Sequence, residues 1–177
     1  LPADITEEKV DAFEVMSYSN CHQGGIELDL WYRLLNCGLE LPGCAGTDAV
    51  MSELYSQPIG GYRTYVLVPP DSQFTFERWL EGLAAGRTFV TNGPLITRFQ
   101  VNGLSPGGSA RIGKDGRYCS STLSVRCSHP LDRAEIIMNG EVVRSFEFEP
   151  GECSLDEEFD LWIDRSAWVA AKITGPN

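Results

Sequence analysis

One carboxylate, Asp48, occupies a position typical of catalytic and metal-binding groups. The short apolar run Cys44-Ala45 lies between glycines and leads to Asp48, and an amphipathic helical pattern precedes it. In a β/α chain this layout places Asp48 at the carboxyl end of a buried strand, where such groups gather in barrels and open sheets. Aspartate is also common as the cap of a following turn, so position alone weighs the two roles about evenly.

A second carboxylate, Glu14, lies in Ala12–Met16, a run that predicts a buried strand. Apolar residues at helical spacing from Ile26 to Leu35, followed by Gly38, predict a helix between this strand and the one before Asp48. The βαβ unit aims both strand ends the same way, so Glu14 and Asp48 could bind a divalent cation together. Two carboxylates alone make a poor site, because catalytic zinc usually has three protein ligands.

Two further polar residues, Arg63 and Asn92, lie at the edges of predicted strands and could contact a substrate by orienting an anionic or carbonyl group. Such residues more often hydrogen-bond their own loops. His22, in the loop after the first strand, could be a ligand or a substrate contact, although a loop histidine is usually neither. No G-x-S-x-G motif occurs, and Gly107-Gly108 precedes a strand rather than a helix, which argues against a phosphate-binding loop.

The composition restricts the partners. The 177 residues carry a net charge of −11, and the sequence pI is about 4.6. This disfavours nucleic acid and anionic membranes, which need clustered lysine and arginine. The apolar runs are too short to span a bilayer. Leu1 is not a start methionine, so we expect the native N-terminus to be missing, and the compartment stays open.

The cysteines favour free thiols. There are six, at positions 21, 37, 44, 119, 127 and 153, and none forms a C-x-x-C pair. A structural zinc site is therefore not expected. A chain with this apolar content also has no need of disulfides.

The first part of the chain, residues 1–96, is predicted to be α/β. Asp4–Glu7 resembles a capping box that opens a helix through Val10. Arg63–Val68 and Thr88–Val90 are predicted strands. Between them, apolar residues at helical spacing from Phe76 to Ala84 predict a helix with Thr75 as its N-cap.

The second part, residues 97–177, is predicted to be a β-sandwich. After Pro94 alternation replaces helical spacing, and turn signals come at short intervals. Asn139-Gly140 fits a type I′ turn between two β-branched runs and predicts a hairpin. Trp162 and Trp168 could stack on a ligand of this part, although buried sandwich tryptophans are commoner.

Several stretches resemble the carboxyl-terminal part of the CehA/McbA-type metallohydrolases, relatives of the PHP phosphoesterases. The residues that carry the resemblance are, in chain order, Phe13–Val15, Trp31–Gly38, Ala45–Ala49, Gly60–Val66, Gly86–Pro94 and Val101–Gly103, with weaker matches at Asn139–Glu141 and Ser166–Ala170. Each stretch is unspecific alone, but the ordered series covers most of the chain.

The resemblance implies a fold of α/β plus all-β type, namely the end of a PHP-like β/α barrel followed by a β-sandwich. It implies a cluster of divalent metals (Zn, Mn or Fe) whose bound hydroxide attacks a phosphate ester, a carbamate or a related bond in a small-molecule substrate. Gly46-Thr47-Asp48 is similar to the last metal motif, in which the aspartate is a ligand. PHP relatives have a histidine two positions later, where this chain has Val50.

The histidine-rich motifs of the family lie upstream and are absent from these 177 residues. The chain is therefore expected to be a fragment of a longer hydrolase, inactive alone and binding no metal by itself. A partial barrel leaves strand edges and apolar faces uncovered, so self-association is expected. The alternative is a binding module whose sandwich recognises carbohydrate or protein; a third reading, a degenerate paralogue, draws slight support from Val50.

Overall fold

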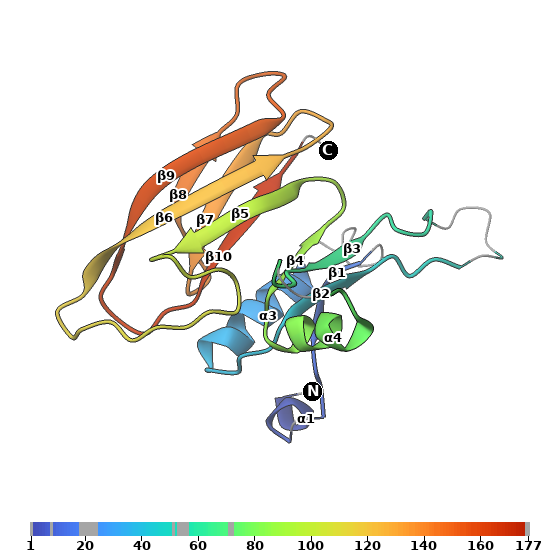
Figure 1. The fold of residues 1–177 in the computed structure, drawn as a ribbon, viewed down its shortest axis with the longest axis horizontal. Helices are drawn as coiled ribbons and strands as arrows, with labels where there is room; N and C mark the ends of the chain where they lie inside the picture. The colour runs from blue at the N-terminus through green and yellow to red at the C-terminus, as the bar shows by residue number, and fades with distance from the viewer. Residues whose placement is uncertain are drawn as a thin grey trace. The chain divides into compact units, whose positions relative to one another are not determined.

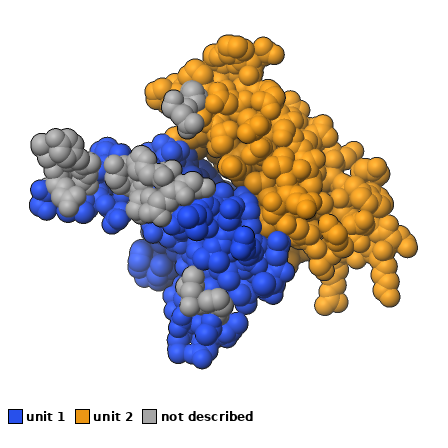
Figure 2. Space-filling model, turned by 180° about the vertical axis from the view of Figure 1, so that it is seen from behind, with its two compact units in different colours: residues 1–92 blue, residues 93–177 orange. Residues whose placement is uncertain are grey.

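The computed structural model describes residues 2–7, 9–17, 25–50, 52, 57–70 and 73–175. The chain divides into two compact units, residues 1–92 and 93–177 (Figure 2). The sequence pattern placed this boundary at residues 96 and 97, so the structure assigns a few more residues to the second unit. The fold is mostly β, with few helices (Figure 1).

The first unit begins with α1 (Pro2–Thr6), β1 (Phe13–Ser17), α3 (Ile26–Asn36) and β2 (Gly43–Gly46). The capping-box prediction is wrong in its bounds, because the first helix ends at Thr6 and so includes residues expected to cap it. The predicted βαβ unit is confirmed. β1 and β2 pair in parallel, from Phe13 opposite Gly43 to Ser17 opposite Gly46.

A small core holds this unit together. Phe13 of β1, Leu34 of α3 and Leu41 ahead of β2 are buried against one another. The Trp31 indole N–H donates to the Leu41 carbonyl oxygen at 2.8 Å and so ties α3 to the segment that enters β2. Gly38, with φ of +78°, ends α3 as expected of a C′ glycine.

The remaining elements of the unit are β3 (Arg63–Val66), α4 (Phe76–Ala84) and β4 (Thr88–Thr91). The Thr75 hydroxyl caps α4 by accepting a hydrogen bond from the Arg78 amide at 3.3 Å, as predicted. β3 and β4 pair antiparallel. The strands in the described part of this unit thus form one parallel and one antiparallel pair and no closed barrel.

The second unit is sandwich-like. One antiparallel sheet has the strand order β5 (Leu95–Val101), β6 (Arg117–Arg126) and β9 (Ser154–Ile163). The other has the order β10 (Val169–Thr174), β7 (Arg133–Met138) and β8 (Glu141–Glu147). The Asn139-Gly140 turn between β7 and β8 is confirmed, since both residues have positive φ, +53° and +88°.

Strict alternation builds the core of this unit. Along β6 the buried residues are Cys119, Ser121, Leu123 and Val125, and their neighbours in sequence face outward. Phe159, Leu161 and Ile163 of β9 and Ala134 and Ile136 of β7 complete the same core cluster. Residues of both sheets therefore share one apolar interior, as in packed sheets generally.

The cysteine prediction agrees with the structure where the chain is described. Cys37, Cys44, Cys119, Cys127 and Cys153 are free thiols, whereas Cys21 lies outside the described residues. No helix in the described ranges is long and apolar enough to cross a membrane.

Truncation of the β6 core should destabilise the protein strongly. Leu123 is 0% exposed, so Leu123→Ala should lower the free energy of unfolding by about 2–5 kcal/mol through lost burial and a residual cavity. Urea denaturation followed by circular dichroism measures the loss. The matched control is Val142→Ala, at a side chain that is 51% exposed, which should stay within about 0.5 kcal/mol. Equal losses in the two variants would contradict the assignment of the core.

Candidate functional site

Asp48 lies just beyond the carboxyl end of β2, where the sequence pattern placed it. Its side chain is exposed, and its φ of +52° is in the left-handed region. Among residues other than glycine, aspartate and asparagine adopt this region most readily. The backbone therefore turns sharply at Asp48 and leaves the carboxylate accessible at the end of the parallel strand pair.

Threonine hydroxyls join β2 to the antiparallel pair. The Thr64 hydroxyl of β3 accepts from the Ala45 amide at 2.8 Å and donates to the Ala45 carbonyl oxygen at 3.0 Å. The Thr88 hydroxyl of β4 donates to the Gly43 carbonyl oxygen at 3.1 Å. These side chains satisfy backbone groups of β2 that a neighbouring strand would otherwise pair. β2 is thereby fixed between β1 and the β3–β4 pair.

Thr47 fixes the turn beside Asp48. Its hydroxyl accepts from the amides of Gly60 and Tyr62, at 3.1 and 3.3 Å, and donates to the Tyr62 carbonyl oxygen at 3.2 Å. A methyl group added at Gly61 would lie 3.2 Å from the Pro58 carbonyl oxygen, so this turn is closely packed. The backbone immediately before Asp48 is thus held to the segment that leads into β3.

Glu14 is not at the end of its strand, and that part of the prediction is corrected. It is the second residue of β1 and pairs with Cys44. Its long side chain nevertheless extends to the end of β2 and accepts a hydrogen bond from the Gly46 amide. A Cβ added at Gly46 would lie 2.9 Å from Glu14 Oε1, so the carboxylate would have to shift if Gly46 were replaced.

The environment of Glu14 disfavours its charge. Partial burial of the carboxylate against β2 raises the pKa of Glu14, and the negative charges of Asp48 and, less strongly, Glu27 raise it further. The Gly46 hydrogen bond acts in the opposite direction. Burial, with a smaller effect from Glu14, also raises the pKa of the Cys44 thiol above 9.0, so this cysteine stays protonated near neutral pH.

Glu27 is the group that the sequence pattern did not single out. It lies in the first turn of α3, and its buried Oε2 atom has no hydrogen-bond partner among the described residues. The available signal was positional: the helix that follows a parallel strand begins at that strand's carboxyl end, where functional groups gather. Two further carboxylates, Asp48 and, less strongly, Glu27, therefore act electrostatically on Glu14.

Arg63 and Asn92 lie at one end of the β3–β4 pair, because Arg63 pairs with Thr91 and Asn92 follows it. Arg63 donates from Nη1 to the Gly60 carbonyl oxygen at 3.1 Å, and within the described ranges its buried Nε has no hydrogen-bond partner. The guanidinium is thus used in part by its own loop. Asn92 is exposed. Both Thr47 and Arg63 hydrogen-bond to the backbone of Gly60. The turn at Gly60 therefore links the start of β3 to the residues next to Asp48.

The described residues hold no group of three or more histidine, cysteine, aspartate or glutamate side chains that could bind a metal ion. His22, with the loop around it, lies outside the described residues. The predicted pair of Glu14 and Asp48 is brought together, but this part of the chain supplies an incomplete ligand set. Comparisons with protein-family models, curated proteins and solved structures found no match.

The two hydrogen bonds between the Thr64 hydroxyl and the backbone of Ala45 should be needed to hold the carboxyl end of β2 in place. Thr64→Val keeps the side-chain shape but leaves the half-buried N–H and C=O of Ala45 unsatisfied, at a cost of about 1–3 kcal/mol. Hydrogen exchange of the Ala45 amide should accelerate accordingly. The control, Thr97→Val, removes one exposed bond to the Ser124 carbonyl oxygen and should leave Ala45 exchange unchanged. Unaltered exchange of the Ala45 amide in Thr64→Val would show that these two hydrogen bonds do not stabilise β2.

Neutralising Glu14 should stabilise the protein near neutral pH. The raised pKa means that the folded state binds this proton more tightly than the unfolded state, so stability falls as pH rises from about 4.5 through the raised value. Glu14→Gln removes that loss and keeps an acceptor for the Gly46 amide. Its Tm should exceed that of the wild type near pH 7, and the difference should vanish below pH 4.5.

The control for this measurement is Glu81→Gln, on the exposed side of α4, which should shift Tm equally little at both pH values. A Tm of Glu14→Gln at or below that of the wild type near neutral pH would contradict the repulsion between Glu14 and Asp48.

Proposed function

We propose that this chain is the carboxyl-terminal portion of a metal-dependent hydrolase of the CehA/McbA type, related to the PHP phosphoesterases. The observation that carries the proposal is the meeting of Glu14 and Asp48 at the end of parallel strands β1 and β2. The charge of Asp48 raises the pKa of Glu14, so the two carboxylates act on each other. The chemistry is hydrolysis of a phosphate ester or of a carbamate or other ester-type bond.

The donor chemistry suits a divalent cation. Carboxylate oxygens bind manganese, iron and zinc, and a cation between Glu14 and Asp48 would relieve their repulsion. Asp48, exposed on a sharp backbone turn, would be the principal ligand from this chain, and Glu14 would be the second. The metal, when bound, supplies a hydroxide nucleophile at neutral pH.

Other residues of this chain would act on the substrate. Arg63 offers a cation at the end of β3, beside the turn that Thr47 fixes, and could orient an anionic oxygen. Asn92, exposed at the neighbouring end of β4, offers an amide for a second polar contact. Both are binding roles.

A complete centre needs further ligands, which the proposal places in upstream barrel strands of the parent protein. Apolar side chains exposed on the first unit support this. Tyr65 of β3, Leu67 directly after it, and Phe76 and Leu80 of α4 are all exposed. In the proposed parent protein, such side chains could pack against the rest of a barrel. For the same reason the isolated chain is expected to self-associate, which sedimentation at several concentrations would detect.

The test compares the complete gene product with the 177-residue chain by elemental analysis after purification without chelator. We expect bound zinc, manganese or iron in the former and none in the latter. In the complete protein, Asp48→Asn should lower metal-dependent hydrolysis of bis(p-nitrophenyl) phosphate or 1-naphthyl methylcarbamate by more than about 100-fold, since even residues that only support ligands cost 10–100-fold.

The control is Asp11→Asn, at an exposed residue ahead of β1, which should keep both metal and activity. Absence of metal from both proteins, even after loading with zinc or manganese, would overturn the hydrolase proposal.

A further inference from the structure

The outer face of the β5–β6–β9 sheet carries an exposed aromatic pair. Tyr118 of β6 and Trp162 of β9 are opposite each other in the register. Their ring centroids are 5.0 Å apart, with the ring planes tilted by 58°. Tyr118 is 68% exposed and Trp162 46% exposed. Neither ring belongs to the core cluster of the second unit, so the sandwich interior is complete without them.

The position of Trp162 is defined by Gly116. A Cβ added at Gly116, which has φ of +70°, would lie 2.8 Å from Cζ2 of the indole. The indole therefore lies against bare backbone, in space that another residue would fill. Together with the contact to Tyr118, this holds the ring in a fixed orientation while nearly half of it stays open to solvent. A preorganised aromatic surface loses little conformational entropy when it binds a ligand.

Polar side chains continue the same face beside the rings. Opposite pairs follow in the register, Ser120 with Asp160 and Thr122 with Glu158. In the part of the chain that the structure describes, the carboxylates of Asp160 and Glu158 form no hydrogen bond or ion pair. The Thr122 Oγ1 atom is buried, whereas Ser120 and Asp160 are exposed. A hydroxyl that donates and accepts therefore lies opposite a carboxylate that only accepts, next to an apolar ring surface.

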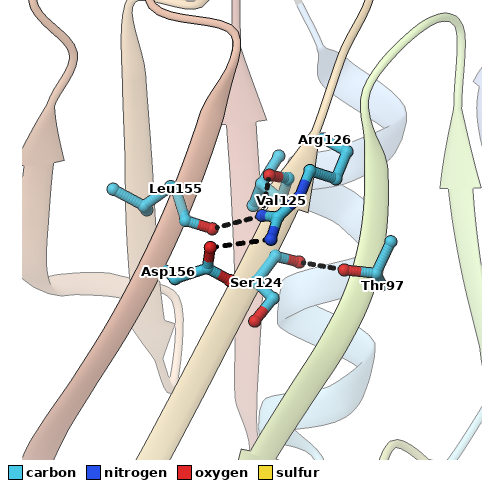
Figure 3. Close-up of polar contacts among 6 residues, drawn as sticks. All are labelled: Thr97, Ser124, Val125, Arg126, Leu155 and Asp156. Atoms are coloured by element: carbon cyan, nitrogen blue, oxygen red, sulfur yellow. Dashed lines mark hydrogen bonds and ion pairs between the residues drawn. The ribbon is translucent and has the colours of Figure 1, made fainter.

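Two arginines of this face are hydrogen-bonded. Arg98 of β5, opposite Ser124, donates to Gln100 Oε1 at 3.1 and 3.0 Å and keeps its positive charge. Arg126, at the far end of β6, donates to Asp156 Oδ2 at 2.7 Å and to the carbonyl oxygens of Leu155 and Val125 at 3.1 and 2.8 Å (Figure 3). On this face the register places the unpaired carboxylate of Asp160 next to the aromatic pair. An anionic polysaccharide or a nucleic acid would be repelled there, since both need free cations.

We propose that this surface, formed by Tyr118, Trp162, Ser120 and Asp160, binds a neutral oligosaccharide. A pyranose ring has an apolar C–H face that can stack on an indole or phenol and a rim of hydroxyls that donate to carboxylates. The surface offers these two features side by side. The site belongs to the second unit, and its function does not depend on the metal centre proposed for the first.

The experiment is isothermal titration calorimetry of the full chain with cellohexaose, xylohexaose, mannohexaose and chitohexaose, in the presence of EDTA. At least one hexasaccharide should bind. Trp162→Ala and Tyr118→Ala should each weaken that binding about tenfold or more, which corresponds to about 1.4 kcal/mol per tenfold. Trp162→Phe keeps an aromatic face and should retain most of the affinity, and Asp160→Asn should weaken it while leaving the fold intact. Binding in EDTA separates this site from the metal centre.

The matched control is Phe74→Ala, which removes an aromatic ring that is 69% exposed elsewhere in the chain and should leave binding unchanged. Three results would overturn the proposal: no heat with any hexasaccharide at millimolar concentration, equal affinity of Trp162→Ala and wild type, or tighter binding of an oligolysine peptide than of any sugar. The last result would assign the surface to a basic protein segment. Loss of stability without any measurable sugar binding would show that the rings serve only as a cross-strand pair.

Discussion

The arrangement of the first unit depends on how the backbone of β2 is satisfied on both sides. On one side β2 pairs in parallel with β1, and on the other the Thr64 hydroxyl bonds both the N–H and the C=O of Ala45. Buried backbone groups need such partners, so a short strand with one conventional neighbour persists only because side chains replace the second. Thr47 and Asp48 come directly after this fixed strand in the chain, so the position of the strand end determines where they lie.

The same strand end concentrates negative charge. The carboxylate of Glu14 lies close to Gly46, and the carboxylates of Asp48 and Glu27 act on it in a partly desolvated setting. Such an arrangement costs stability, and a protein tolerates that cost most readily where a bound cation or a proton offsets it. This reasoning favours a site over a merely structural cluster, while the small number of ligands explains why the proposed centre needs residues beyond those described.

The second unit uses strand alternation for two purposes at once. From Cys119 to Val125 the odd-numbered residues of β6 fill the core, so the residues between them lie on the outer side, where Tyr118 and Ser120 are exposed. Because the core does not include the outward-facing Tyr118 and Trp162, these side chains are available to bind a ligand. The binding-module alternative indicated by the sequence thus becomes compatible with the hydrolase proposal, since the two concern different units of one chain.

Local sequence patterns determined most of the secondary structure, because helix spacing, strand alternation, the Thr75 cap and the Asn139-Gly140 turn depend on residues close in the chain. They also determined that Asp48 would follow a strand. Only the tertiary structure decided the rest. It paired β3 with β4 antiparallel, brought Asp48 and Glu27 near Glu14, and placed Trp162 against Tyr118. These features depend on contacts between residues distant in sequence, whose energies no local pattern records.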